Sequence, residues 1–207
     1  VGPEAAALLA ELPNDARPLV AQTVSLKRRL GPARTHLLLQ QVELRRRAQT
    51  KFSLADRMYF TPTLLEQATD EWIARYKASR FPAGRLVVDL CCGIGGDLAG
   101  LARQGPVVAV DMNPVHSLLA TANCEALGLE LGSAVIADAA EVSLQRFVAW
   151  HIDPDRRADR RRTIRLEWSA PPLADMQRML RLVPDAAIKL APASEPPERW
   201  NDLAERQ

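Results

Sequence analysis

Apolar and polar positions follow two different patterns along the chain, and the pattern changes near Pro82. Before this residue, apolar side chains recur every three or four positions, as they do in amphipathic helices. Residues 33–49 fit one such helix, and residues 61–81 fit another. We therefore expect a helical N-terminal region over residues 1–80. The second helix would carry one apolar face, made of Leu65, Ala68, Trp72, Ile73 and Tyr76.

After Pro82, short apolar runs alternate with helical segments. Strands that are apolar throughout and alternate with helices form parallel sheets that are covered on both faces. Residues 81–207 are therefore predicted to be an α/β domain with a doubly wound, mainly parallel, Rossmann-like sheet. The expected strands are 85–90, 106–111, 133–138, 147–153 and 186–191. The expected helices are 96–103, 172–182 and 114–127, the last with Val115, Leu118, Leu119, Ala122 and Leu127 facing inward.

The composition is that of an ordinary globular protein. Apolar residues make up 47% and charged residues 25%, and the net charge of +2 predicts no particular partner. The three cysteines, two of them adjacent at Cys91 and Cys92, have neither a disulfide nor a zinc spacing, which favours a reduced, cytoplasmic setting. No apolar run is long enough to span a bilayer, and the first residues lack the basic start of a secretory signal. We expect neither a membrane nor a metal partner.

A glycine-rich turn directly follows the first predicted strand. The sequence VVDLCCGIGGD (87–97) places Asp89 at the strand end, and Gly93 and Gly95 where the backbone can approach a ligand closely. Ligands of such sheets bind beyond the carboxyl ends of the strands, so the turn predicts a nucleotide-like ligand. The spacing differs from the dinucleotide pattern G-x-G-x-x-G, and Asp89 would repel a pyrophosphate.

Acidic residues end three successive predicted strands. Asp89 is suited to a ligand with an ammonium and a sulfonium group, and S-adenosylmethionine carries both. Asp111 is placed to accept hydrogen bonds from ribose hydroxyls, and Asp138 to meet an adenine amine. The alternative is that each acid only caps the helix that follows it. The three acids together with the glycines favour one S-adenosylmethionine site.

These motifs resemble those of the class I S-adenosylmethionine-dependent methyltransferases over about residues 59–191. DLCCGIGGD is similar to the family's glycine motif, with Cys91 where glycine is commoner, and VVAVDMNP is similar to its ribose motif. The resemblance implies that Met112 lies against the adenine. MYFTPTLLEQAT resembles a segment that places Phe60 and Thr61 beside the methionine end of the cofactor, with Thr61 at its carboxylate.

The sequence HIDPDRR (151–157) stands where amino-methylating members carry an acid, amide or serine, two prolines and an aromatic residue. The resemblance implies that Asp153 and the carbonyl of Pro154 hold the amine that is methylated. Here Asp155 and Arg156 replace the second proline and the aromatic residue, which is a departure from the pattern. The alternative is a simple turn at the end of the strand.

A basic run follows this motif, with six arginines between residues 155 and 165. On the substrate side of a sheet, such a run is a candidate phosphate contact, and we assign Arg156, Arg157 and Arg160 to substrate binding. A solvated surface loop is the alternative. The basic residues Arg45, Arg46, Arg47 and Lys51 offer weaker support for a nucleic-acid partner.

The narrowest resemblance is to bacterial methyltransferases that carry a C-terminal THUMP-like domain, and a more distant one is to the trimethylguanosine synthases. Both imply RNA, so the expected function is S-adenosylmethionine-dependent methylation of a base in tRNA or rRNA. The alternatives are a non-catalytic RNA-binding protein with this fold, or a methyltransferase that acts on protein or a small molecule. Because such sheets have two further edge strands, we expect the C-terminal edge to be missing here. His151 is expected to be a packed strand residue and the cysteines to be turn residues. The oligomeric state is left open.

Overall fold

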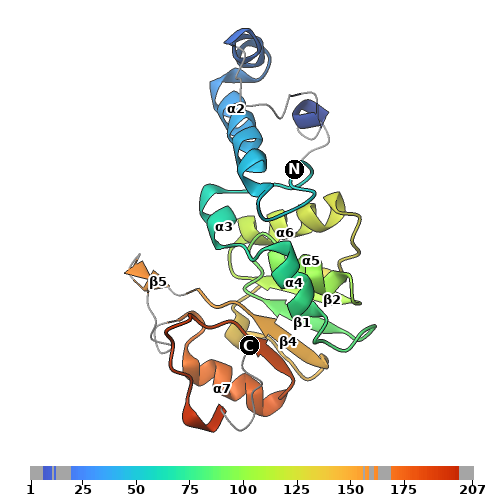
Figure 1. The fold of residues 1–207 in the computed structure, drawn as a ribbon, viewed down its shortest axis with the longest axis vertical. Coiled ribbons are helices and arrows are strands. Elements are labelled where there is room, and N and C mark those ends of the chain that lie inside the picture. The colour runs from blue at the N-terminus through green and yellow to red at the C-terminus, as the bar shows by residue number, and fades with distance from the viewer. Residues whose placement is uncertain are drawn as a thin grey trace.

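The chain forms a parallel sheet with helices on both faces and a helical extension at one end (Figure 1). A computed structural model describes residues 7–10, 12, 20–155, 157–158, 161–162 and 169–200. Its helices are α2 (Val20–Ala48), α3 (Pro62–Gln67), α4 (Glu71–Ala78), α5 (Gly96–Ala102), α6 (Pro114–Ala126) and α7 (Leu173–Leu182), with short 3-10 turns η1 (Ala139–Glu141) and η3 (Glu198–Trp200). Its strands are β1 (Val87–Leu90), β2 (Val107–Asp111), β3 (Ser133–Ile136), β4 (Ala149–Ile152), β5 (Arg157–Ala158), β6 (Arg161–Arg162) and β7 (Ala186–Ile188).

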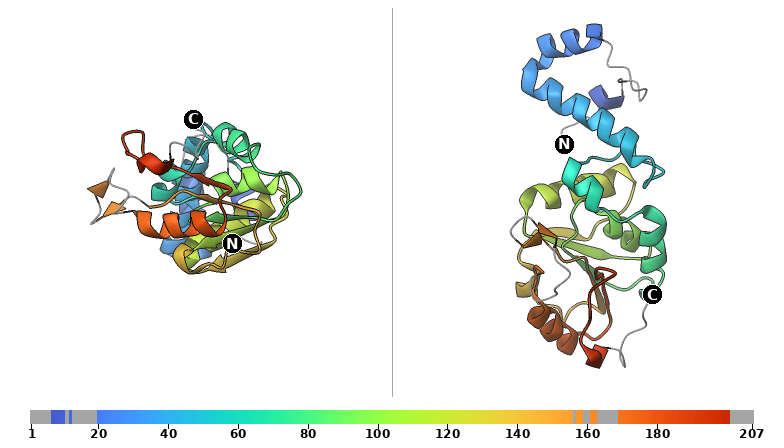
Figure 2. Two further views of the ribbon diagram at one scale, coloured as in Figure 1. Left: turned by 90° about the horizontal axis from the view of Figure 1, so that it is seen from below. Right: turned by 60° about the vertical axis from the view of Figure 1, so that its left-hand side comes forward.

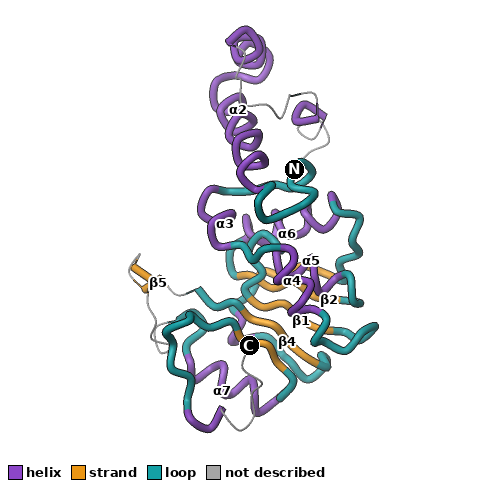
Figure 3. The backbone as a smooth tube through the Cα atoms, in the orientation of Figure 1, coloured by secondary structure: helices purple, strands orange, loops and turns teal. Residues whose placement is uncertain are grey.

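The main sheet confirms the predicted α/β fold. Its five strands run parallel in the order β3-β2-β1-β4-β7, so the chain winds outward from β1 in both directions (Figure 3). Each predicted strand is present, although each is shorter than expected. In the register of β1 and β4, Asp89 lies beside His151. Neighbouring residues in register point to the same face of a sheet, so the two side chains meet.

The two faces of the sheet bury alternate residues of the same strands. One face, covered by α4, α5 and α6, buries Val87, Val107 and Ala149. The other face, covered by α7 and the 142–147 loop, buries Val88 and Trp150. Figure 2 shows α7 on the side of the sheet away from the green helices. Asp89 and His151 belong to the first face, beneath α4 and α5.

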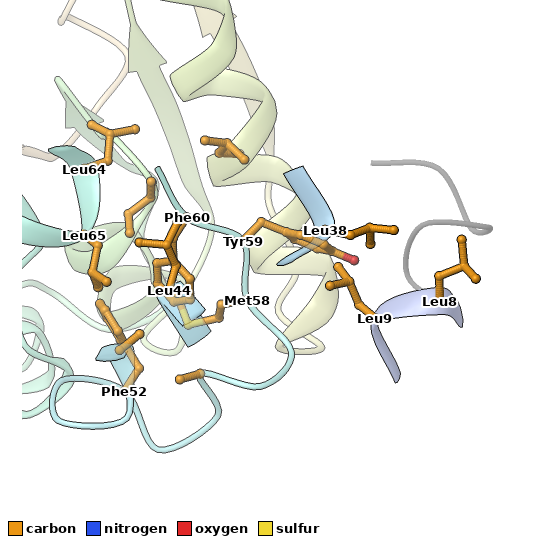
Figure 4. Packing of buried hydrophobic residues seen from close by; sticks show 14 residues of the cluster. Leu8, Leu9, Leu38, Leu44, Phe52, Met58, Tyr59, Phe60, Leu64 and Leu65 are labelled. Carbon is orange, nitrogen blue, oxygen red and sulfur yellow. The ribbon is translucent and has the colours of Figure 1, made fainter. Parts of the chain in front are cut away.

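The helical extension packs on the sheet domain through its own apolar cluster. α2 continues through a kink at Gly31 and Pro32, so the expected helix at 33–49 is the second half of a longer element. Leu44, Phe52 and Phe60 lie in this cluster (Figure 4), and residues of α6 and of the glycine turn join it. The extension and the sheet domain therefore share buried contacts, and a division at residue 80 stays a prediction. Within the part of the chain that the structure describes, no helix has both the length and the apolarity to cross a membrane.

The expected helix at 61–81 is two helices, and its predicted apolar face is confirmed at Leu65 and Ala68 but wrong in α4. α3 ends at Ala68, and Asp70 caps α4 by accepting from the N–H of Trp72 at 2.8 Å. Trp72 is 66% exposed, and Ile73 and Tyr76 are also exposed. The reason is the close packing of α4 on α5: a Cβ atom at Gly100 would lie 2.6 Å from the carbonyl oxygen of Ala74. Only small residues fit at this contact, so Ala74 and Ala78 face inward.

The inward face predicted for α6 is also displaced. Leu119 is buried as expected, but Val115 and Leu118 are exposed. The buried side carries the small residues Ala120 and Cys124 instead. A Cβ atom at Gly95 would lie 3.4 Å from the Cα atom of Ala120, so the glycine turn approaches α6 too closely for large side chains.

The basic run after β4 contains a short hairpin where a loop was expected. β5 and β6 pair antiparallel, with Arg157 opposite Arg162. Asp155 and Ala170, which lie before and after this hairpin in sequence, form an antiparallel bridge with backbone hydrogen bonds of 3.1 and 2.8 Å. Figure 1 shows β5 projecting from the body of the molecule.

Asn123 ties the extension, the glycine turn and α6 together. It is buried, and its amide donates to the carbonyl oxygens of Tyr59 and Ile94 at 3.1 and 2.9 Å. Its side-chain oxygen accepts from the N–H of Tyr59 at 2.7 Å. One side chain thus satisfies three backbone groups from two distant segments.

We expect Asn123→Ala to lower the free energy of unfolding by about 3 kcal/mol, because it leaves buried backbone groups without partners. Urea unfolding followed by circular dichroism measures the change. Leu118→Ala, at an exposed position of the same helix, is the matched control and should change stability by less than about 1 kcal/mol. Equal losses in the two variants would contradict the assigned role of Asn123.

Candidate functional site

A cavity of about 650 Å³ lies beyond the carboxyl ends of β1, β2 and β4. This volume falls within the range of cofactor and ligand pockets. The position is the point where the strand order reverses, since β2 and β4 flank β1. The cavity brings together most of the predicted site residues: Asp89, Cys91, Gly93, Asp111, Met112, Asp138, Asp153 and Pro154.

The glycine turn is held in left-handed backbone conformations that favour glycine. Gly93 and Gly95 have φ of 56° and 86°, and the non-glycine residue Cys91 has φ of 61°. Gly93 lines the cavity, and its N–H donates to Asp111 at 3.0 Å. Gly95 is not among the lining residues, because it begins α5 and packs against Ala120.

Asp111 is fixed by hydrogen bonds to both carboxylate oxygens. Gly93 donates to Oδ2, while the N–H of Asn113 and Nδ1 of His116 lie 2.9 and 3.1 Å from Oδ1. Burial opposes the charge of Asp111, but these hydrogen bonds lower its pKa below the ordinary value. The carboxylate therefore stays ionised and keeps lone pairs for a ligand. Met112, next in sequence, is 66% exposed beside the same cavity.

Asp138 stands at the third strand end and also caps a helix. Its Oδ1 accepts from the N–H of Ala140 at 2.9 Å at the start of η1. Its side chain nevertheless lines the cavity. The capping and binding explanations of this acid are therefore compatible, since capping occupies one carboxylate oxygen.

Asp89 and His151 form a buried pair in the floor of the cavity. Nδ1 of His151 lies 2.7 Å from Oδ1 of Asp89, and both side chains are almost fully buried. Because Asp89 offers only acceptors, Nδ1 carries the hydrogen. Oδ2 of Asp89 is buried and has no hydrogen-bond partner among the residues that the structure describes. This oxygen therefore keeps an unused acceptor in the floor of the cavity.

The far side of His151 meets a second charged pair. Nε2 lies 3.4 Å from Nζ of Lys77 on α4 and 3.8 Å from Oδ2 of Asp97 on α5. Lys77 and Asp97 are themselves paired at 2.5 Å. Burial opposes the charge of His151, but Asp89 and Asp97 raise its pKa above the ordinary value. Burial raises the pKa of Asp89 by more than His151 lowers it.

The predicted acceptor corner contains a lysine that sequence reasoning missed. Asp153 and Pro154 line the cavity after β4. Lys189, directly after β7, forms an ion pair with Oδ2 of Asp153. Lys189 also donates to the hydroxyl of Thr69 at 3.3 Å, and this hydroxyl donates to Asp97 at 2.7 Å. Hydrogen bonds therefore connect Asp153 to the charged pair beneath the cavity.

Two residues assigned by resemblance do not line the cavity. Phe60 is 1% exposed in the apolar cluster of the extension (Figure 4). The side-chain amide of Gln41 donates a hydrogen bond to the carbonyl oxygen of Phe60 and accepts one from its N–H. The oxygen of Thr61 accepts from the N–H of Leu64 at 3.2 Å and caps α3. The next segment lies closer: Leu64 and the residues from 66 to 69 line the cavity instead.

The predicted phosphate contacts lie largely outside the described residues. Arg156 and Arg160 are outside the described residues. Of Arg157, only the backbone in β5 is described. Their role in substrate binding stays a prediction.

Three of the four basic residues upstream have structural partners, and Arg47 is exposed. Arg45 is buried and donates to the carbonyl oxygens of Arg57 and Met58. Arg46 pairs with Glu43. Lys51 donates to three carbonyl oxygens at the end of α3, those of Leu65, Glu66 and Ala68. These contacts weaken the upstream support for a nucleic-acid partner, which now rests on the exposed Arg46 and Arg47 and stays a prediction.

Comparisons with known proteins agree with this geometry. Residues 84–147 match a family model described as RNA cap guanine-N2 methyltransferase. Two proteins from strains of Mycobacterium tuberculosis, both described as uncharacterized S-adenosylmethionine-dependent methyltransferases, are 36% identical over 166 residues. These matches cover 75% of this chain and 44% of the relatives, so the chain spans less than half of their length.

A solved structure shares the fold over most of the chain. It is a protein from Porphyromonas gingivalis W83 that is described as a methyltransferase, with a TM-score of 0.65 and 22% identity. The superposition covers 89% of this chain and 48% of that chain.

The buried histidine makes stability depend on pH. A folded-state pKa above the ordinary value of 6.5 stabilises the protein below that pH, and this contribution is lost as the pH rises through the folded-state pKa. We expect His151→Asn to lower the free energy of unfolding by about 1–3 kcal/mol at pH 5.5, and by less at pH 8.5. Urea unfolding at both pH values measures the difference. His36→Asn, at an exposed position on α2, is the control, and a pH-independent loss in His151→Asn would contradict the assignment.

Proposed function

We propose that the protein is a class I S-adenosylmethionine-dependent methyltransferase that methylates an amine nitrogen of an RNA base. The match of residues 84–147 to the family model, the two mycobacterial relatives and the shared fold support this proposal. The family model that the chain matches is described by this kind of reaction. The observation that carries the proposal is that Asp89, Asp111, Asp138 and Asp153 line one cavity, where we propose that the first three bind the cofactor and Asp153 the acceptor.

The lining residues fit S-adenosylmethionine, the cofactor of this family. The buried, unpartnered Oδ2 of Asp89 suits the ammonium group. Asp111 suits the two ribose hydroxyls, and Asp138 with Met112 suits the adenine. When bound, S-adenosylmethionine supplies a methyl group activated by a positive sulfur.

The charge of the cavity favours a cationic cofactor and a neutral acceptor. Among the described lining residues, eight are acidic, whereas one is a lysine and two are histidines. This excess of negative charge would attract a sulfonium and an ammonium, and repel phosphates. A base would therefore enter the cavity alone while its phosphates stay outside, as in enzymes that extrude a base. Arg156, Arg157 and Arg160, next to the acceptor corner in sequence, are our proposed phosphate contacts.

Asp153 and Pro154 would act by orienting the acceptor. Their oxygens accept hydrogen bonds from the two N–H groups of an exocyclic amine, which directs the nitrogen lone pair toward the methyl group. As the methyl group left sulfur, which would become a neutral thioether, and bonded to the nitrogen, the nitrogen would become positive. Asp153 would stabilise that charge until the surplus proton passed to water. Asp155 and Arg156 stand where an aromatic residue is usual, so base stacking would fall to a guanidinium.

The setting proposed for this function is cytoplasmic. Cys91, Cys92 and Cys124 are free, as expected in a reducing compartment. The resemblance to methyltransferases with a THUMP-like domain adds the prediction that an RNA-binding module acts together with this domain.

We expect Asp111→Ala to weaken S-adenosylmethionine binding by about 100-fold, because two charge-assisted hydrogen bonds to ribose are lost. Isothermal titration calorimetry measures the dissociation constant. Glu125→Ala, an exposed acid on α6, is the control and should bind normally. Equal affinity in wild type and Asp111→Ala would contradict the cofactor site.

We expect Asp153→Ala to reduce methyl transfer to RNA by at least about 100-fold while S-adenosylmethionine binding changes less than about threefold. Tritium transfer from labelled S-adenosylmethionine to bulk tRNA and rRNA provides the assay. Label in protein or metabolite fractions instead of RNA would replace the proposed substrate. RNA binding without any transfer by the wild type would favour the non-catalytic alternative.

We expect replacement of Arg156, Arg157 and Arg160 by serine to weaken RNA binding about tenfold or more and to flatten its salt dependence. Cofactor affinity should not change. Filter binding at several salt concentrations measures both RNA effects. The charge-matched control replaces Lys27, Arg28 and Arg29 on α2 by serine, and an equal effect there would mean that only net charge matters.

A further inference from the structure

We propose that Lys189 is a specificity-determining residue, which donates a hydrogen bond to a ring nitrogen next to the amine that Asp153 holds. This inference rests on the proposed function and concerns how the same cavity selects its base. Lys189 and Asp153 would form a donor–acceptor pair that faces the substrate.

The structure fixes Lys189 at the acceptor corner from two sides. Its backbone N–H donates to the carbonyl oxygen of Ile152 at 2.9 Å, which aligns the end of β7 with the end of β4. Its ammonium pairs with Oδ2 of Asp153, and both side chains remain partly exposed, at 30% and 24%. Both residues line the cavity. An ion pair with a purely structural role, such as joining β7 to β4, would not need to line this cavity.

The hydrogen bonds of Lys189 are incomplete. An ammonium has three donors, and two are directed to Asp153 and to the hydroxyl of Thr69. Within the described residues, the third donor of Lys189 has no acceptor, and Oδ1 of Asp153 has no donor. The pair therefore offers one free donor beside one free acceptor.

The orientation of this donor is set by its neighbours. The single hydrogen of Thr69 is given to Asp97 at 2.7 Å, so its oxygen can only accept from Lys189. Asp97 is held in turn by Lys77 at 2.5 Å. Two N–H groups of the Lys189 ammonium are therefore held by Thr69 and Asp153. Because the ammonium is tetrahedral, these two hydrogen bonds also fix the direction of the third N–H.

A donor beside an acceptor is complementary to an amine beside a ring nitrogen. Adenine has this arrangement at N6 and N1, cytosine at N4 and N3, and guanine at N2 and N3. Uracil lacks the amine. On the other side of the guanine amine, N1–H would oppose a lysine donor, so guanine would have to present N3. Uracil could also form two hydrogen bonds with the pair, through N3–H and O4, but it presents no amine to the methyl group. The pair would therefore hold an amine for methylation only in adenine, cytosine and guanine.

The experiment replaces Lys189 in the full-length protein and removes its partner atom from the substrate. Wild type, Lys189→Met and Lys189→Arg are incubated with labelled S-adenosylmethionine and bulk tRNA and rRNA, and mass spectrometry of the nucleosides identifies the methylated base. Transcripts of that RNA are then prepared with the matching deaza nucleoside, in which the ring nitrogen is replaced by C–H.

We expect Lys189→Met to reduce kcat/KM about 10- to 100-fold, the effect of one hydrogen bond to a charged group. The deaza substrate should reduce wild-type activity by a similar factor and have little further effect on Lys189→Met, because both changes remove the same bond. Lys189→Arg should retain part of the activity. S-adenosylmethionine affinity should stay within about twofold in all variants. Lys27→Met, an exposed position on α2, is the control.

Several outcomes would overturn the inference. Full activity of Lys189→Met would do so, as would a deaza effect of equal size in wild type and Lys189→Met. If Lys189→Met unfolds, equal wild-type activity on the natural and the deaza substrate would overturn the inference, because it would mean that the ring nitrogen accepts no hydrogen bond. Label on a ribose or a ring carbon would overturn the inference that Asp153 and Lys189 hold an amine and its neighbouring ring nitrogen. The protein would still be an RNA methyltransferase. Failure of wild type to label any RNA would overturn the proposed function together with this inference.

Discussion

The hydrogen bond between Asp89 and His151 constrains the rest of the site. The two residues are neighbours in register on adjacent central strands, so the sheet brings a carboxylate and an imidazole together under α4 and α5. A buried charge is unfavourable unless it is compensated, and the compensation comes from Lys77 and Asp97 on those two helices. The close contact of α4 with α5 at Gly100 permits this approach. The floor of the cavity is therefore fixed by electrostatics as well as by packing.

Charge balance links the cofactor side of the cavity to the acceptor side. Three carboxylates, those of Asp89, Asp97 and Asp153, face two lysines, Lys77 and Lys189. Protonation of His151 would bring this group to neutrality, which is consistent with the direction of its pKa shift. With His151 neutral, the excess of one negative charge can be matched by a cationic ligand instead. In the proposed function, the same carboxylates would serve both the stability of the fold and the selection of the cofactor.

The sequence predicts the parts of the site that local pattern determines. Strands, the glycine turn and the acids at Asp89, Asp111 and Asp138 follow from alternation and from residues with special backbone geometry. His151 and Lys189 could not be assigned because their roles depend on register and on strand order, which bring together positions far apart in the chain. The outward face of α4 was mispredicted for a related reason, since a backbone contact at Gly100 favours small residues over large apolar ones.

The hydrogen bonds from Lys189 to Thr69 and from Thr69 to Asp97 have a fixed direction. They connect Lys189, which pairs with Asp153, to the charged pair beneath Asp89 and His151. Thr69 has one hydrogen, and giving it to Asp97 leaves only lone pairs for Lys189. Any ligand that draws Asp89 away from His151 changes the charge that Asp97 and Lys77 must balance. The hydroxyl of Thr69 is the hydrogen-bonded link between this charged pair and Lys189. Thr69 belongs to the short connection between α3 and α4, so the helical segment before the sheet is part of the site and not only a support for it.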